Sequence, residues 1–198
     1  MTATTRDELL AAATKLFAEK GFYGASIATI ARELGLTKQA LLHHFGSKEK
    51  LYGEVLKVVS GEIQEAVGDI VAREADPRDR LEALVLAQYA HQMANPDAAR
   101  LIMRELLDNE RRAENAGNWY LTPYLNTVVD TALAIQDLGL DRAGAVAMVY
   151  QLLGAAHYFA VSQPTLDKMF GRELFTATRT RYEDELRTLI RARVAAPG

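Results

Sequence analysis

Cysteine is absent from this 198-residue sequence. Without thiols the chain has no disulfide bonds and no thiolate metal ligands, and a reducing cytoplasm is its natural compartment. The first residues, MTATTRDELLAAATKLF, include the acids Asp7 and Glu8 and lack an uninterrupted apolar block, so a secretory signal is not expected. We therefore expect a cytoplasmic protein.

A strong excess of positive charge is also missing, because the formal net charge is −3. The charge is nevertheless uneven along the chain. Residues 1–50 hold seven Lys and Arg against five Asp and Glu, whereas the remainder holds sixteen against twenty-one. A mildly basic first quarter followed by an acidic remainder indicates two units with different partners.

The alternation of apolar and polar residues that is typical of strands is scarce. Apolar residues recur instead at intervals of three and four, which predicts an all-α fold. Caps and breaks at Gly21, Ser26, Gly35 and Thr37 set the first helix boundaries. The expected helices cover about residues 9–21, 27–34, 38–45, 47–73, 77–94, 96–109, 118–137, 141–162 and 172–195.

The helices are shorter before residue 47 than after it. We therefore divide the chain into an N-terminal three-helix domain, 1–48, and a larger helical-bundle domain, 49–198. The helix at 47–73 has a length of roughly 40 Å at the usual rise per residue, enough to join the two physically. Pro123 leaves two interpretations open, because it either kinks its helix or marks the start with Thr122 as cap.

Residues 143–161 carry no formal charge, which makes them long enough to consider as a membrane span. The segment is rich in Ala and Gly, includes Gln151 and His157, and lies among charged amphipathic helices. It therefore predicts a helix buried on several sides and no membrane contact.

The segment around residues 27–45 has the pattern of a helix-turn-helix, in which two short helices meet at a tight turn. Ala31 is small enough for the helices to cross closely, and Gly35 adopts a backbone geometry that other residues resist. On a helical wheel Leu41 and Phe45 share one edge, and Gln39 and His43 lie on the other.

The N-terminal part of the second helix of such a motif enters the major groove of DNA. There Gln39 suits adenine, Lys38 suits guanine, and Leu42 suits a thymine methyl group. Ser26, Thr37 and Lys48 lie at helix starts, where hydroxyls, amides and an ammonium hold phosphates. The resulting candidate DNA contacts are Ser26, Thr37, Lys38, Gln39, Leu42, His43, His44 and Lys48.

Residues 9–56, LLAAATKLFAEKGFYGASIATIARELGLTKQALLHHFGSKEKLYGEVL, resemble the TetR-type transcriptional regulators. The resemblance covers about the first quarter of the chain, through the order EKGF, GLTK, HF and SKEKL. It implies a homodimer that binds a near-palindromic operator and releases it when a small molecule binds the C-terminal domain. It also implies phosphate contacts for Thr37 and Lys48 and recognition-helix positions for Lys38, Gln39, His43 and His44.

The chain departs from this family at Gln39-Ala40-Leu41-Leu42, where many members read Gly-Thr-Leu-Tyr. The departure lies where base sequence is read, so it concerns the operator sequence and leaves the fold unchanged. We expect no cofactor and no metal, because adjacent His43 and His44 point about 100° apart on a helix and the other histidines lie in remote segments. His44 is expected to be half-buried against the first helix.

The C-terminal domain is expected to supply dimerisation and ligand sensing. Helices near 141–162 and 172–195 are expected to pair with a second copy, the latter through Phe175, Tyr182, Leu186 and Leu189. A core helix inside one chain is the alternative for the first of these helices. Aromatic and Met side chains suited to a small apolar or aromatic effector are Tyr89, Met93, Met103, Trp119, Tyr120, Tyr124, Tyr150, His157 and Phe159.

Two other classes of function remain as alternatives to a ligand-responsive DNA-binding repressor. An all-α enzyme or metalloprotein is disfavoured, because neither the Glu-x-x-His motif of di-iron bundles, nor a nucleophile elbow, nor a phosphate loop is present. A regulator that acts only through protein contacts is disfavoured by Lys38, Gln39 and Lys48. We therefore predict that no reaction is catalysed.

Overall fold

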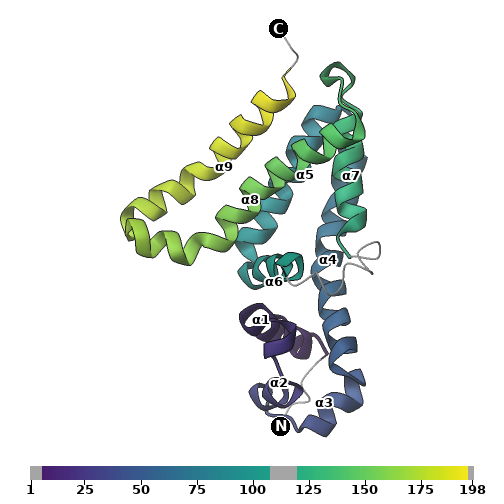
Figure 1. Ribbon diagram of the computed structural model, residues 1–198, viewed down its shortest axis with the longest axis vertical. Helices are drawn as coiled ribbons and strands as arrows, with labels where there is room; N and C mark the ends of the chain where they lie inside the picture. Colours follow the sequence, from purple (N-terminus) through teal and green to yellow (C-terminus); the bar gives the residue numbers. More distant parts are fainter. Residues whose placement is uncertain (1–5, 108–119, 196–198) are drawn as a thin grey trace. The chain divides into compact units, whose positions relative to one another are not determined.

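The computed structural model describes residues 6–107 and 120–195. Within these ranges the chain forms helices and no strands, which confirms the all-α prediction (Figure 1). The helices are α1 (Arg6–Gly24), α2 (Ile27–Glu33), α3 (Lys38–Phe45), α4 (Lys48–Arg73), α5 (Pro77–Ala94), α6 (Pro96–Leu107), α7 (Thr122–Leu133), the 3-10 turn η3 (Gln136–Leu138), α8 (Arg142–Phe170) and α9 (Arg172–Val194).

The chain packs into two compact units, each built from separate stretches of sequence. Unit 1 comprises residues 1–62 and 97–120, and unit 2 comprises residues 63–96 and 121–198. Unit 1 thus contains the part of α4 up to residue 62 and nearly all of α6 in addition to α1 to α3.

The core of unit 1 fills the space between its short helices with apolar side chains. The best-buried members are Leu9, Leu16, Phe17, Ile30, Leu41 and Leu51. Ala31 is 1% exposed where α2 packs on α3, so its small side chain permits the close crossing that the sequence predicts. Gly35 follows with φ of 65°, and the next amide, that of Leu36, donates to the Ala31 carbonyl at 2.8 Å. This conformation favours glycine, because other residues adopt positive φ only with strain.

Helix α6 is fixed to the rest of unit 1 by two neighbouring side chains. The Arg104 guanidinium donates to the carbonyl oxygens of Ala18 and Glu19 near the end of α1, at 2.7 Å each. The hydroxyl of Tyr52, on α4, donates to the carboxylate of Glu105. A helix distant in sequence therefore satisfies polar groups of α1 and α4.

Unit 2 is a bundle in which α5 packs against α7, α8 and α9. Its α7 begins at Thr122 with Pro123 in the first turn, so Pro123 marks the start of the helix and does not kink it. Leu121, and not Thr122, precedes the helix. The expected extent to residue 137 was too long, because α7 ends at Leu133 and the separate turn η3 follows.

Helix α8 continues to Phe170, so its predicted end near residue 162 was wrong. Pro164 lies inside this helix and has no amide to donate to the Ala160 carbonyl. The side-chain amide of Gln163 donates to that carbonyl at 3.2 Å and replaces the missing bond. Among the described helices α8 is the one whose length and composition suit a membrane span, a test that core helices of soluble proteins also pass.

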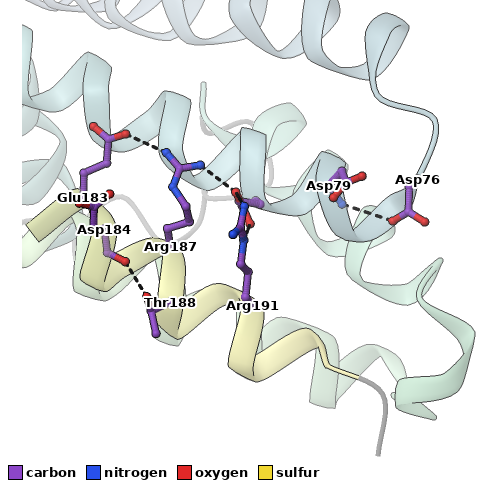
Figure 2. Close-up of polar contacts among 8 residues, drawn as sticks. Asp76, Asp79, Glu183, Asp184, Arg187, Thr188 and Arg191 are labelled. Atoms are coloured by element: carbon purple, nitrogen blue, oxygen red, sulfur yellow. Dashed lines mark hydrogen bonds and ion pairs between the residues drawn. The ribbon is translucent and has the colours of Figure 1, made fainter.

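Helix α9 is held on α5 by a cluster of charged side chains. Figure 2 shows Arg187 and Arg191 of α9 projecting toward α5, where both donate to the carboxylate of Glu82. Arg191 forms two hydrogen bonds, of 2.7 and 3.0 Å, and Arg187 forms one of 2.8 Å. These bonds, that from Arg191 above all, hold the pKa of Glu82 below its ordinary value, while burial opposes them.

Candidate functional site

The starts of α2 and α3 are organised by hydroxyl caps. Ser26 Oγ accepts a hydrogen bond from the Thr29 amide at 3.0 Å, and Thr37 Oγ1 accepts one from the Ala40 amide at 3.1 Å. Both caps match the positions expected from the sequence. Each hydroxyl lies at the surface, where it and the free amides of the first turn are accessible to a phosphate.

Helix α3 has one buried edge and one exposed edge. Leu41 and Phe45 are 0% and 6% exposed and form the core edge. Lys38, Gln39 and His43 are exposed on the other side, as the helical wheel predicts. Leu42 lies between the two edges and is half-buried. Donor groups are therefore presented along one side of a well-anchored short helix.

His44 differs from the expectation that it packs half-buried against α1, because its side chain is exposed. Its ring centroid lies 6.1 Å from that of His43 and 6.4 Å from that of Phe45. Within the parts of the chain that the structure describes, no three His, Cys, Asp or Glu residues gather in a way that suits a metal ion.

Lys48 lies at the start of α4, where its ammonium nitrogen is 4.4 Å from the centre of the Phe22 ring. Ser47 Oγ accepts from the Lys50 amide at 3.2 Å and caps this helix. Sequence reasoning missed the role of Phe22, because the partners are 26 positions apart and no local spacing links them.

A second set of charges lies beside α3 and was also missed. Glu54 accepts from Arg6 at 2.7 Å and from Lys57 at 2.9 Å, and these two bonds lower its pKa, the Arg6 bond most. The guanidinium of Arg6 also lies 5.6 Å from the centre of the Phe45 ring. These residues, with His44 and Lys50, line an open hollow on unit 1.

The ligand candidates do not form one group in the structure. Tyr89, Tyr124, His157 and Phe159 are buried in unit 2, and Met93 is half-buried there. Tyr150, in contrast, is 55% exposed. Met103 and Tyr120 belong to unit 1, and Trp119 lies outside the described residues.

Unit 2 buries polar atoms that have no hydrogen-bond partner among the described residues. They include Gln88 Oε1, Gln92 Oε1 and the Tyr124 hydroxyl, on side chains that are 6%, 1% and 3% exposed. The side-chain nitrogen of Gln92, Nε2, lies 2.7 Å from His157 Nδ1. Burial raises the pKa of Tyr124, which stays neutral at physiological pH.

Gln88 and Gln92 were not among the sequence candidates. Their signal was a pair of polar residues one turn apart on a helix whose neighbours Leu81, Leu84 and Val85 are apolar. Such a pair faces one direction, and in α5 that direction is the interior of the bundle.

Helix α8 has an exposed apolar stripe opposite its buried face. Val146, Tyr150 and Tyr158 are 38%, 55% and 71% exposed and recur at multiples of four residues. The apolar stripe predicted on α9 is not exposed in the same way. Phe175 and Leu186 are buried within unit 2, and Tyr182 stacks on Phe159 with ring centroids 3.7 Å apart. Leu189, the last of that stripe, is 47% exposed.

The fold is all-α, and α2 and α3 form a helix-turn-helix in which both helices have side-chain caps. These features define the class of helix-turn-helix proteins. The family model described as "Bacterial regulatory proteins, tetR family" matches residues 9–55. The N-terminal helices of the chain are therefore similar to this family.

Two relatives of known name show the same similarity. The chain is 37% identical over 109 residues to the HTH-type transcriptional repressor KstR2 of Rhodococcus jostii, covering 54% of this chain and 53% of that protein. It is 30% identical over 114 residues to the HTH-type transcriptional repressor NicS of Pseudomonas putida, covering 58% and 54%. The chain thus spans about half the length of these relatives. Both names describe regulators and not enzymes.

A solved structure extends the similarity to the whole chain. The crystal structure of SCO4942 from Streptomyces coelicolor, assigned as a transcriptional regulator, covers 98% of this chain and is itself covered completely. The TM-score is 0.69 at 27% sequence identity.

Proposed function

We propose that this protein is a ligand-responsive transcriptional repressor that binds a near-palindromic operator as a homodimer in the cytoplasm. The observation that carries the proposal is the exposed edge of α3. It presents Lys38, Gln39 and His43 while Leu41 and Phe45 anchor the helix in the core. A helix of this kind, supported by a preceding helix across a tight turn, fits the major groove.

Each group on this face has a proposed role. Lys38 and Gln39 read bases, with guanine and adenine as their preferred partners, His43 reads a neighbouring base edge, and Leu42 contacts a thymine methyl group. The remaining residues hold the DNA backbone without reading sequence. They are Ser26, Thr37, His44 and Lys48.

The proposed dimer uses the exposed stripe of α8 together with α9. Val146, Tyr150 and Tyr158 repeat along one face, and an exposed apolar face of this kind is suited to burial against its own copy. Two copies place two recognition helices in successive major grooves, about 34 to 36 Å apart. The operator is therefore expected to contain two related half-sites at that spacing.

The proposed effector site is the interior of unit 2. Buried polar groups without partners carry a free-energy cost that a bound molecule with matching hydrogen-bonding groups removes. Gln88, Gln92 and Tyr124 supply such groups, and Tyr89 and Phe159 supply an apolar wall. A small molecule with an apolar or aromatic body and a polar end fits this chemistry.

Release of DNA requires only a modest preference of the effector. The effector needs to bind the form that cannot hold the operator more tightly than the form that can. A difference of about 1 to 3 kcal/mol between these two binding free energies lowers operator affinity by about 5- to 150-fold.

Fluorescence anisotropy tests the central claim. The protein is titrated against labelled duplex DNA from beside its own gene and against a scrambled duplex of equal length, across a series of salt concentrations. We expect tighter binding to the first duplex and a steep decrease of affinity with salt for both. Equal affinity for the two duplexes would contradict sequence-specific binding.

A further inference from the structure

The phosphate-binding Lys48 of the proposed DNA interface is not free in the structure. Its ammonium lies over the face of Phe22, 4.4 Å from the ring centre, and both side chains are half-buried. The Phe22 ring is itself fixed by aromatic neighbours. Its centroid is 5.0 Å from that of Tyr52, 5.3 Å from that of Tyr23 and 6.3 Å from that of Phe17.

We propose that Phe22 is a positioning residue for DNA binding, which holds the Lys48 ammonium where it meets a backbone phosphate. The inference rests on the proposed function, because it assigns a supporting residue to the same interface. The ring contact persists in the complex, so Phe22 contributes to affinity without touching DNA.

The chemistry of the ammonium allows both contacts at once. It carries three N–H donors, of which the ring face engages one side and leaves the others to a phosphate oxygen. A free lysine loses much rotamer freedom when it becomes ordered on a phosphate. Lys48 has lost part of that freedom before DNA arrives, which reduces the entropic cost of binding.

The charges at the start of α4 make this placement matter. Glu49 follows directly, and its own backbone amide and then the Ser47 hydroxyl hold its pKa below the ordinary value. A carboxylate at this position repels a phosphate. The positive charge of Lys48 must therefore stay at a fixed place for the start of α4 to attract DNA.

A double-mutant cycle measured by anisotropy across a salt series tests the inference. Phe22→Leu should weaken binding to all duplexes by about two- to fivefold, the amount expected for a cation–π contact that water partly reaches. The salt slope should stay unchanged, because no charge is removed. Lys48→Ala should weaken binding and reduce the slope by about one. In the Lys48→Ala background, Phe22→Leu should have no further effect.

The controls separate positioning from folding. Phe22→Tyr keeps an aromatic face and should bind as the unmodified protein does. Lys50→Ala removes a more exposed charge two residues away, and adding Phe22→Leu to it should still produce the full two- to fivefold loss. Thermal melting verifies folding, and Phe22→Met replaces Phe22→Leu if the latter unfolds the protein.

Three outcomes are distinguishable. An equal loss from Phe22→Leu with and without Lys48 overturns the inference, because it assigns Phe22 a purely structural role. Unchanged or tighter binding by Phe22→Leu also overturns it, because the ring then competes with the phosphate. If Lys48→Ala itself has no effect on any duplex, the proposed phosphate contact fails and the inference fails with it.

Discussion

The two units each bury a tyrosine to the same extent but treat its hydroxyl differently. Tyr52 of unit 1 and Tyr124 of unit 2 are both 3% exposed. The Tyr52 hydroxyl donates to Glu105, whereas the Tyr124 hydroxyl has no partner among the described residues. In unit 1 the buried group is satisfied and the unpaired donors face outward on α3. In unit 2 unpaired groups lie inside.

This difference corresponds to two kinds of recognition. A surface that binds DNA needs a rigid scaffold with exposed donors, because the polyanion approaches from outside. A receptor for a small molecule needs buried groups whose hydrogen bonds the molecule completes. The contrast supports the proposed DNA contact on unit 1 and the proposed effector site in unit 2.

The largest expected effect comes from separating the two copies without touching unit 1. Tyr158→Asp places a charge in the exposed apolar stripe of α8 and should make the protein monomeric by light scattering. Affinity for a palindromic operator should fall by about 10²-fold or more, because the two reading helices lose their linkage. Val71→Asp, at a 40% exposed site on α4, is the control and should leave the mass unchanged.

Gln39→Ala alters the reading face of unit 1 alone. We expect a loss of about 1 to 3 kcal/mol in discrimination at one position of each half-site, because a bidentate contact to a base is removed. Anisotropy with operator variants measures it. Unchanged preference at every position would show that Gln39 does not face the groove.

Glu82→Gln tests the charged contact that holds α9 on α5 (Figure 2). The free energy of unfolding should fall by about 1 to 2 kcal/mol at pH 7, because three charge-assisted hydrogen bonds are weakened and Arg191 is largely screened by water. Glu183→Gln removes one exposed bond to Arg187 and should cost less than about 0.5 kcal/mol.

The pH dependence of this contact has a defined sign. The pKa of Glu82 in the folded protein is below its ordinary value of 4.5. Its contribution is therefore fully present above pH 4.5 and is lost as the pH falls through the lowered pKa. Urea titrations should show the unmodified protein and Glu82→Gln converging in stability below pH 4.5. A constant difference down to the lowest pH would contradict this assignment.

A final pair of substitutions tests the two tyrosines directly. Tyr52→Phe removes the hydroxyl that donates to the buried Glu105 carboxylate and should destabilise the protein by about 1 to 3 kcal/mol. Tyr124→Phe removes a hydroxyl that has no partner and should change stability by less than about 0.5 kcal/mol or increase it slightly. Denaturant unfolding measures both. A substantial loss from Tyr124→Phe would contradict the unpaired state of its hydroxyl.

The sequence predicted unit 1 well because its signals are local. The caps at Ser26 and Thr37, the turn at Gly35 and the buried edge of Leu41 and Phe45 all depend on neighbours within a few positions. The exposed His44 and the Lys48 contact with Phe22 depend on packing between distant segments, so no spacing rule predicts them.

Unit 2 was harder to predict, since its interior depends on which face each long helix turns inward. Tyr150 and His157 occupy the same apolar segment, yet one is exposed and the other buried. Helix α8 continues beyond Pro164, where the Gln163 side chain supplies the hydrogen bond that proline lacks. The general tendency of proline to end helices does not reveal this local compensation. The two units are not separated by one boundary at residue 48, because α6, which is distant in sequence, also belongs to unit 1.

The place of α6 in unit 1 determines which residues an engineered fragment must contain. Arg104 on α6 supplies hydrogen-bond donors to the carbonyl groups of Ala18 and Glu19 in α1. A fragment ending at residue 62 leaves those acceptors without it. A chimaera that transplants the DNA-reading part onto another sensor must therefore carry residues 97–107 along with residues 1–62, so the transferable module is discontinuous in the gene.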